Sequence, residues 1–91
     1  GTIVSGARIR RGILSNVVTV DEGSELDECI VMRGASIGRN CKLRRVIIDK
    51  WNRVPDGTVI GHDLEADRRR FHVSETGIVV VPKGHDFSAA R

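Results

Sequence analysis

The chain has 91 residues, of which 40% are apolar but only 3% aromatic, and its formal net charge is +3 at neutral pH. A chain of this length supports at most one small core, and the scarcity of aromatic residues favours a core of branched aliphatic side chains, as stacked strands form. No apolar run approaches the roughly 20 residues needed to cross a bilayer, and the start does not resemble a signal peptide, so we expect a cytoplasmic protein without a membrane partner.

Residues 3–60 repeat with a period of 17. Aliphatic residues open each row and recur six positions later, and a turn residue followed by a small residue recurs between them. The columns are Ile3, Val20, Ile37 and Val54; Ile9, Leu26, Leu43 and Ile60; Gly6, Gly23, Asn40 and Gly57; and Ala7, Ser24, Cys41 and Thr58. A fixed period indicates a repeat architecture, and short alternating runs indicate strands. The sequence therefore predicts an all-β parallel solenoid of about three and a half coils of 17 residues.

Charged residues also fall into columns, and their signs alternate. The columns are Arg8, Glu25 and Lys42; Arg10, Asp27 and Arg44; and Arg11, Glu28 and Arg45. Equivalent residues of adjacent coils lie about 4.8 Å apart, so each acid is expected between two bases, which favours this register over a slipped one. The basic charge is thus largely accounted for, and without interleaved aromatic residues we expect no nucleic-acid partner.

The two cysteines, Cys29 and Cys41, are too few for a disulfide framework and lack CxxC spacing. Cys41 falls in the column of small residues. We expect buried, reduced, structural thiols.

The repeat breaks down after Ile60. We expect a short helix over residues 64–71 with Arg68, Arg69 and Arg70 paired to acids of the same helix, a turn over 74–77, a strand over 78–81 and a frayed end over 84–91. The expected division is β-helix coils in residues 1–63, followed by helix, strand and tail in residues 64–91 of the same domain.

The rows that begin at Val20, Ile37 and Val54 resemble hexapeptide repeats of the left-handed parallel β-helix. The left hand follows from this resemblance alone, because the general crossover rule favours the right hand. A more specific resemblance is carried by the segments IGR (37–39), LRRVIID (43–49), VPDG (54–57), VIG (59–61), RRF (69–71) and SETGIVVV (74–81). In this order they resemble the C-terminal domain of the bacterial glucose-1-phosphate adenylyltransferases, or ADP-glucose pyrophosphorylases.

That resemblance implies a parent nucleotidyltransferase, which makes ADP-glucose and pyrophosphate from ATP and glucose 1-phosphate, with Mg²⁺, in glycogen biosynthesis. Such chemistry needs a Gly-rich phosphate loop and carboxylates for the metal, and this chain has neither. The resemblance therefore implies a segment that has no catalytic residue and no cofactor of its own. The implied partners are an N-terminal catalytic domain, the other subunits of a tetramer, and phosphorylated metabolites and AMP as effectors.

The same resemblance assigns effector binding to Lys50, just after residues 47–49, and to Lys83, just after the last strand. We expect Arg33 and Arg53 to share a column and to line the same face, as secondary candidates. Each lysine is equally well interpreted as a solvated surface residue, because a point charge needs no strict geometry. Between Gly84 and Ala90 only His85 is basic, fewer than the family often carries, which leaves the effector's identity open.

His62, His72 and His85 do not follow the period of the repeat and lie at or beyond the last coil. Metal ligands must converge on one ion, so we predict no metal site. His62 alone is placed as a base at a coil edge facing a neighbouring subunit. Three functions follow: a regulatory and oligomerisation domain of the adenylyltransferase with an inter-domain anion site, a freestanding hexapeptide-repeat acyltransferase that uses His62, or a purely structural scaffold.

Overall fold

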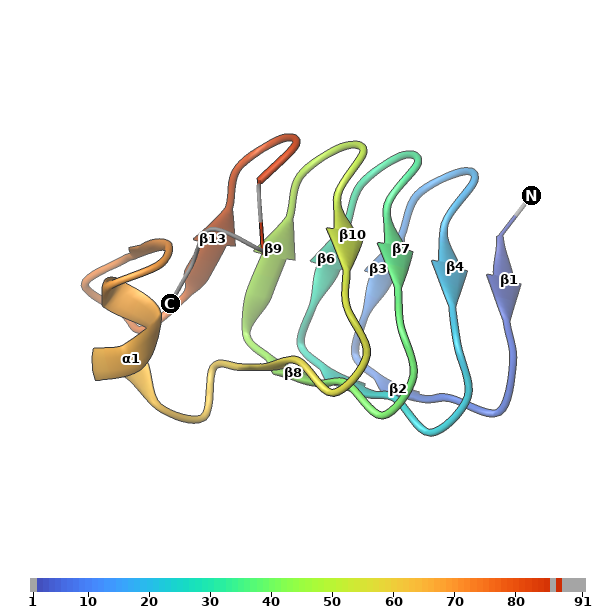
Figure 1. The fold of residues 1–91 in the computed structure, drawn as a ribbon, viewed down its shortest axis with the longest axis horizontal. Helices are drawn as coiled ribbons and strands as arrows, with labels where there is room; N and C mark the ends of the chain where they lie inside the picture. Colours follow the sequence, from blue (N-terminus) through green and yellow to red (C-terminus); the bar gives the residue numbers. More distant parts are fainter. Residues whose placement is uncertain (1, 86, 88–91) are drawn as a thin grey trace.

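The structure, a computed structural model, describes residues 2–85 and 87. Its short strands wind around one axis in successive coils, and a helix lies near one end (Figure 1). In chain order the elements are β1 (Ile3–Val4), β2 (Arg8–Arg10), β3 (Ile13–Leu14), β4 (Thr19–Val20), β5 (Glu25–Asp27), β6 (Ile30–Val31), β7 (Ser36–Ile37), β8 (Lys42–Arg44), β9 (Val46–Ile48), β10 (Arg53–Val54), β11 (Val59–Ile60), α1 (Leu64–Arg68), β12 (His72–Val73) and β13 (Val79–Val81). The predicted β-solenoid with a short helix and a final strand is confirmed.

The strands form three sheets, in the orders β1-β4-β7-β10, β2-β5-β8-β11 and β3-β6-β9-β13-β12. All pairs are parallel except β12 with β13. The register follows the period of the repeat, because Ile9 pairs with Leu26, Leu26 with Leu43, and Leu43 with Ile60. The columns read from the sequence are therefore the physical stacks of the solenoid.

Each coil turns at three corners, and a residue with positive φ occurs at each of them. These residues are Gly6, Gly23, Asn40 and Gly57 at the first corner, Arg11, Glu28 and Arg45 at the second, and Val17, Gly34, Trp51 and Gly84 at the third. The sequence predicted only the first of these columns as turns. At the other two corners bulky residues adopt a backbone conformation that they rarely occupy, which no local signal indicates.

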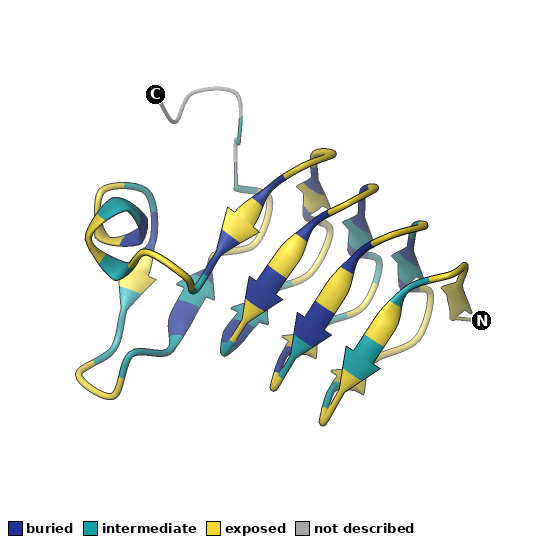
Figure 2. Ribbon diagram, turned by 90° about the horizontal axis from the view of Figure 1, so that it is seen from below, coloured by how far each residue is buried: buried dark blue, intermediate teal, exposed yellow. Residues whose placement is uncertain are grey.

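The core is a stack of aliphatic side chains from the three sheets. The buried residues of the strands are dark blue in Figure 2. The largest fully buried members of the core include Leu26, Ile37, Leu43, Ile48 and Ile60. Each such side chain contributes roughly 1.5–3 kcal/mol relative to full exposure. No helix in the described part of the chain is long and apolar enough to cross a membrane.

Both cysteines are buried free thiols, as predicted. The Sγ of Cys29 donates to the Leu43 carbonyl at 3.4 Å, and the Sγ of Cys41 donates to the Pro55 carbonyl at 3.1 Å. Burial raises the pKa of both thiols, so less thiolate, the reactive form, is present at a given pH. We expect a thiol reagent at mildly alkaline pH to label neither cysteine in the folded chain and both after unfolding. Rapid labelling of the folded chain would contradict this burial.

The main departure from the predicted fold lies between β11 and β13. Here the chain leaves the coil, forms α1 and β12, and returns as β13 beside β9, with Val79 opposite Val46. An unbroken period would place Asp63 opposite Val46, so the stretch from Asp63 to Ile78 is an insertion into one coil. Strand β12 was not predicted, and the sequence did not indicate that the final strand resumes the solenoid.

The boundaries at this end also differ from those expected. Helix α1 ends at Arg68, and the N–H groups of Arg70 and Phe71 both donate to the Asp67 carbonyl in a turn. At the predicted frayed end, His85 N–H donates to the Asn52 Oδ1 at 2.8 Å, so Gly84 and His85 form an ordered corner. Residues 86 and 88–91 of that predicted end lie outside the described residues.

The charge columns lie in the predicted register, but most of the expected ion pairs do not form. Within residues 2–85 and 87, carboxylates lie within 4.0 Å of a cation only at Arg11, which contacts Asp27 at 3.4 Å and Glu28 at 3.1 Å. Pairs as exposed as these contribute about 0–1 kcal/mol. The prediction of a salt-bridged α1 is also wrong, because the buried Asp67 carboxylate accepts the Gly61 N–H at 2.8 Å.

Candidate functional site

Arg33, Lys50 and Lys83 stack at one corner of successive coils. Each lies two residues beyond a member of one strand column, in which Val31 pairs with Ile48 and Ile48 pairs with Val81. The Trp51 N–H also donates to the Arg33 carbonyl at 3.2 Å, which fixes the register at the corner itself. Parallel neighbours lie about 4.8 Å apart. We name this column of three cations the cationic corner.

The expected column of Arg33 and Arg53 is wrong. Arg53 lies on β10 and pairs with Ser36, because its separation from Arg33 does not match the period of the repeat. The neighbour of Arg33 on the following coil is Lys50. Arg53 lies three positions beyond Lys50, exposed at the start of the next strand. The structure therefore brings Arg33, Lys50 and Lys83 together in register and places Arg53 on a different sheet.

Asn52 joins the last two coils at this corner. Its side chain is completely buried, and its amide nitrogen donates to the carbonyls of Asp49 at 3.0 Å and Pro82 at 2.9 Å. Its amide oxygen accepts the His85 N–H at 2.8 Å. Through these bonds the Asn52 side chain links Asp49, which precedes Lys50, to Pro82, which precedes Lys83. Asn52 thus positions the two lysines, although it does not belong to their surface.

The sequence prediction missed Asn52, although a signal was present. The residues that occupy the position of Asn52 one and two coils earlier are Ala35 and Val18, and both are buried. A polar residue in an otherwise apolar inward column must find hydrogen-bond partners, because an unpaired buried polar group is costly. An asparagine at that position therefore indicates a side chain that hydrogen-bonds to the surrounding backbone.

The cationic corner is not neutralised by the described part of the chain. No carboxylate among these residues lies within 4.0 Å of Arg33, Lys50, Lys83 or Arg53. The carboxylate of the adjacent Asp49 instead accepts the Lys50 backbone N–H at 2.6 Å. Like charges placed directly opposite one another are unfavourable, and an anion that contacts two of them offsets that repulsion. The arrangement is therefore suited to binding a phosphate or carboxylate.

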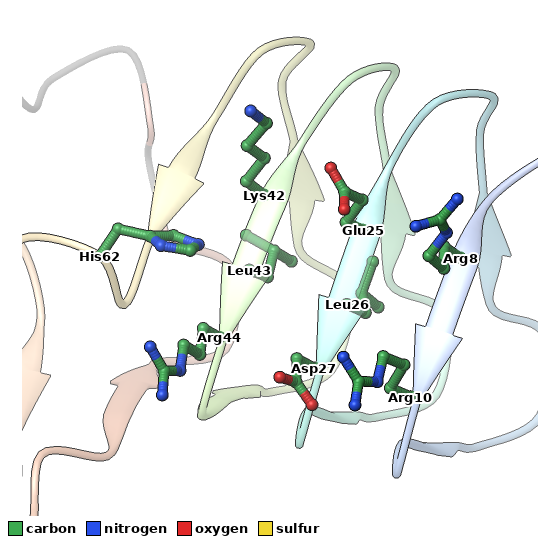
Figure 3. A pocket seen from close by; sticks show the side chains of 9 residues that line it. All are labelled: Arg8, Arg10, Glu25, Leu26, Asp27, Lys42, Leu43, Arg44 and His62. Atoms are coloured by element: carbon green, nitrogen blue, oxygen red, sulfur yellow. The ribbon is translucent and has the colours of Figure 1, made fainter.

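A second feature is a groove of about 250 Å³ on the outer face of β2, β5 and β8 (Figure 3). Its lining consists of Arg8, Arg10, Glu25, Leu26, Asp27, Lys42, Leu43, Arg44 and His62. Charged side chains border it in two rows, and His62 lies at one end, near Lys42 and Arg44. Acids lie between the bases in both rows, so the groove presents both signs of charge, whereas the cationic corner presents one.

His62 gains no support as a catalytic base from the contacts of this chain. Its ring is exposed, and within the described residues no hydrogen bond orients it. A general base is normally held by a partner and lies within reach of the proton that it removes. His72 lies on β12, and His85 packs against Phe71 with ring centroids 4.8 Å apart. Among residues 2–85 and 87, no three His, Cys, Asp or Glu side chains form a group that could hold a metal ion.

Comparison with known proteins identifies the family to which this solenoid belongs. The sequence profile of the family described as "GlmU-like, C-terminal hexapeptide" matches residues 1–81. The chain belongs to this family. The match covers all the coils, whose core consists mainly of buried aliphatic side chains.

Among curated proteins the chain is similar to glucose-1-phosphate adenylyltransferases. It is 48% identical to that of Anaeromyxobacter sp. (strain Fw109-5) over 83 residues, which cover 91% of this chain and 20% of the relative. It is 46% identical to that of Pasteurella multocida (strain Pm70) over 81 residues, 89% of this chain and 18% of the relative. It is 45% identical to that of Koribacter versatilis (strain Ellin345) over 85 residues, which cover 93% of this chain and 20% of the relative. The predicted resemblance is confirmed, and the chain spans about a fifth of the length of these relatives.

Proposed function

We propose that the chain is the C-terminal regulatory and oligomerisation domain of a glucose-1-phosphate adenylyltransferase. The parent enzyme converts ATP and glucose 1-phosphate to ADP-glucose and pyrophosphate with Mg²⁺ bound in its catalytic domain, in the cytoplasm. The partners are that catalytic domain, further subunits and phosphorylated effectors including AMP. Identity of 45–48% to adenylyltransferases over about nine-tenths of the chain supports the parent.

One observation carries the regulatory part of the proposal. Arg33, Lys50 and Lys83 form a column of like charge that the described residues do not neutralise. Elsewhere on the solenoid the basic columns are interrupted by acids. A site kept cationic in this way favours an anion that arrives from outside the chain, and Asn52 holds two of its cations in fixed register.

Thermodynamic linkage explains how effector binding at the cationic corner changes the activity of the catalytic domain. An effector that contacts both the cationic corner and the catalytic domain favours the arrangement of the two that it binds more tightly. The size of the activation then depends on the difference in affinity between the arrangements. Removing one cation lowers that affinity without touching a catalytic group.

The test is to replace Lys50 or Lys83 by alanine in the full-length enzyme. A charge-assisted hydrogen bond contributes about 1.5–3 kcal/mol, so we expect the concentration of phosphorylated activator needed for half-activation to rise about tenfold or more. Turnover without activator should stay close to that of the wild type. Activation curves are measured at fixed ionic strength, because surface electrostatics are screened by salt.

Lys42→Ala is the matched control, because Lys42 is an exposed lysine on a different sheet, in the groove of mixed charge. It should leave the activation curve unchanged. Unaltered activation in both the Lys50 and the Lys83 variants would exclude the corner as the effector site. A parent enzyme whose turnover ignores every phosphorylated effector would identify the chain as a structural scaffold.

A further inference from the structure

Trp51 follows Lys50 directly and adopts an unusual backbone conformation. Its φ is +60°, and the equivalent positions of the neighbouring coils are Gly34 and Gly84. For a residue other than glycine the left-handed region costs roughly 1–2 kcal/mol. Such strain in a bulky residue is a reason to look for a function at that position.

The indole is held against the preceding coil. A Cβ built on Gly34 would overlap the Cε3 and Cζ3 atoms of Trp51, so the ring lies directly over the Gly34 backbone. Gly34 directly follows Arg33, and Trp51 directly follows Lys50, so the indole lies one residue along the chain from the cationic corner. The ring is thereby fixed in place beside the cationic corner.

About half of Trp51 nevertheless remains exposed. Trp51 is 54% exposed, although a large aromatic side chain is usually well buried. Among the described residues the one cation stacked on an aromatic ring is Arg70, over Phe71 at 4.9 Å, so no cation covers the indole. Its exposed surface is a rigid apolar platform next to an anion site.

We propose that Trp51 determines the specificity of the cationic corner by stacking on the flat ring of a phosphate ester, so that nucleoside monophosphates are bound in preference to phosphates without such a ring. The cations bind the phosphate, and the indole binds the base. This inference rests on the proposed function, because it requires a phosphate at the cationic corner. Stacking of a base on an aromatic side chain contributes about 1–3 kcal/mol, which corresponds to a preference of about fivefold or more.

The test uses two probes that differ only in the base, AMP and ribose 5-phosphate. Their affinities for the full-length enzyme are measured by calorimetry with the catalytic site saturated by ADP-glucose. We expect AMP to bind at least about fivefold more tightly to the wild type. Trp51→Leu keeps an apolar side chain over Gly34 but removes the flat ring, so it should abolish most of the preference and leave the ribose 5-phosphate affinity unchanged. Trp51→Phe should retain part of the preference.

Val17→Ala is the matched control, because Val17 is exposed, shares the corner column with Trp51 and also has positive φ. It should alter neither affinity. Equal affinity of the wild type for both probes, or a preference that persists in Trp51→Leu, would overturn the role of Trp51 while the regulatory function stands. If neither probe binds the wild type, or if Lys50→Ala weakens neither, the proposed anion site itself fails.

Discussion

Replacing Asn52 by alanine is expected to lower the free energy of unfolding of the chain by about 3 kcal/mol. The substitution removes three hydrogen bonds from a fully buried site, and each contributes about 1 kcal/mol net. The effect should be concentrated in the last coil, because two of the three bonds reach across to Pro82 and His85. Urea unfolding measures the total change, and amide hydrogen exchange shows whether β13 opens before the earlier coils.

Asn16→Ala serves as the control for this prediction. Asn16 lies at the same corner in the first coil, is exposed, and makes no side-chain hydrogen bond with the described residues. Surface substitutions of this kind change stability by about 0.5 kcal/mol or less. Equal unfolding curves for the two variants would show that Asn52 does not hold the last coil in place. Displacement of Lys83 in the Asn52 variant should also weaken phosphate binding at the cationic corner.

Replacing Gly61 by alanine is expected to destabilise the chain by about 3 kcal/mol, and more than the same change at Gly57. Both glycines have positive φ, +90° at Gly61 and +74° at Gly57, so both substitutions carry the left-handed penalty of roughly 1–2 kcal/mol. At Gly61 the new methyl group also overlaps the backbone carbonyl of Arg44, whereas at Gly57 no atom lies within 4 Å. A backbone atom cannot rotate away as a side chain can, and such overpacking costs about 1–3 kcal/mol more.

The comparison separates conformational strain from steric contact. The loss of stability in Gly57→Ala measures the conformational strain alone. The additional loss in Gly61→Ala measures the steric contact with Arg44. Gly61 is also the point at which the chain leaves the coil, and its N–H donates to Asp67 of α1. A loss of stability at Gly57 equal to that at Gly61 would contradict the close approach of Gly61 to β8.

The insertion after Gly61 explains how the solenoid supplies two lysines to one site. Between β11 and β13 the chain makes a helix and a hairpin and then returns to the stack in register. Because Val81 pairs with Ile48, Lys83 lies beside Lys50, although almost two periods of the repeat separate them along the sequence. The Asn52 side chain connects these two coils by donating to the Pro82 carbonyl. The regulatory proposal therefore depends on the insertion, which brings the last strand back beside β9.

The sequence alone determined the coils of this protein. The aliphatic columns that include Leu26, Leu43 and Ile60 predicted both the strands and their register, because a strict repeat requires equivalent residues to stack. The burial of Cys41 followed in the same way from the column of small residues. The two lysines were identified from the resemblance of residues 37–81 to a family, and no pattern within the chain distinguishes them from other surface lysines.

Only the tertiary structure decided which charges meet. Lys83 lies next to Lys50 because the insertion between β11 and β13 restores the stack after breaking the period, and a broken period carries no information about register. That Arg33 stacks with Lys50 and not with Arg53 follows from the 17-residue period itself. Most alternating charges, however, do not pair, because exposed side chains gain too little from pairing to fix their positions. The placement of Trp51 over Gly34 is likewise a contact between coils. These features depend on atoms that are distant in the sequence, whereas the repeat depends only on local spacing.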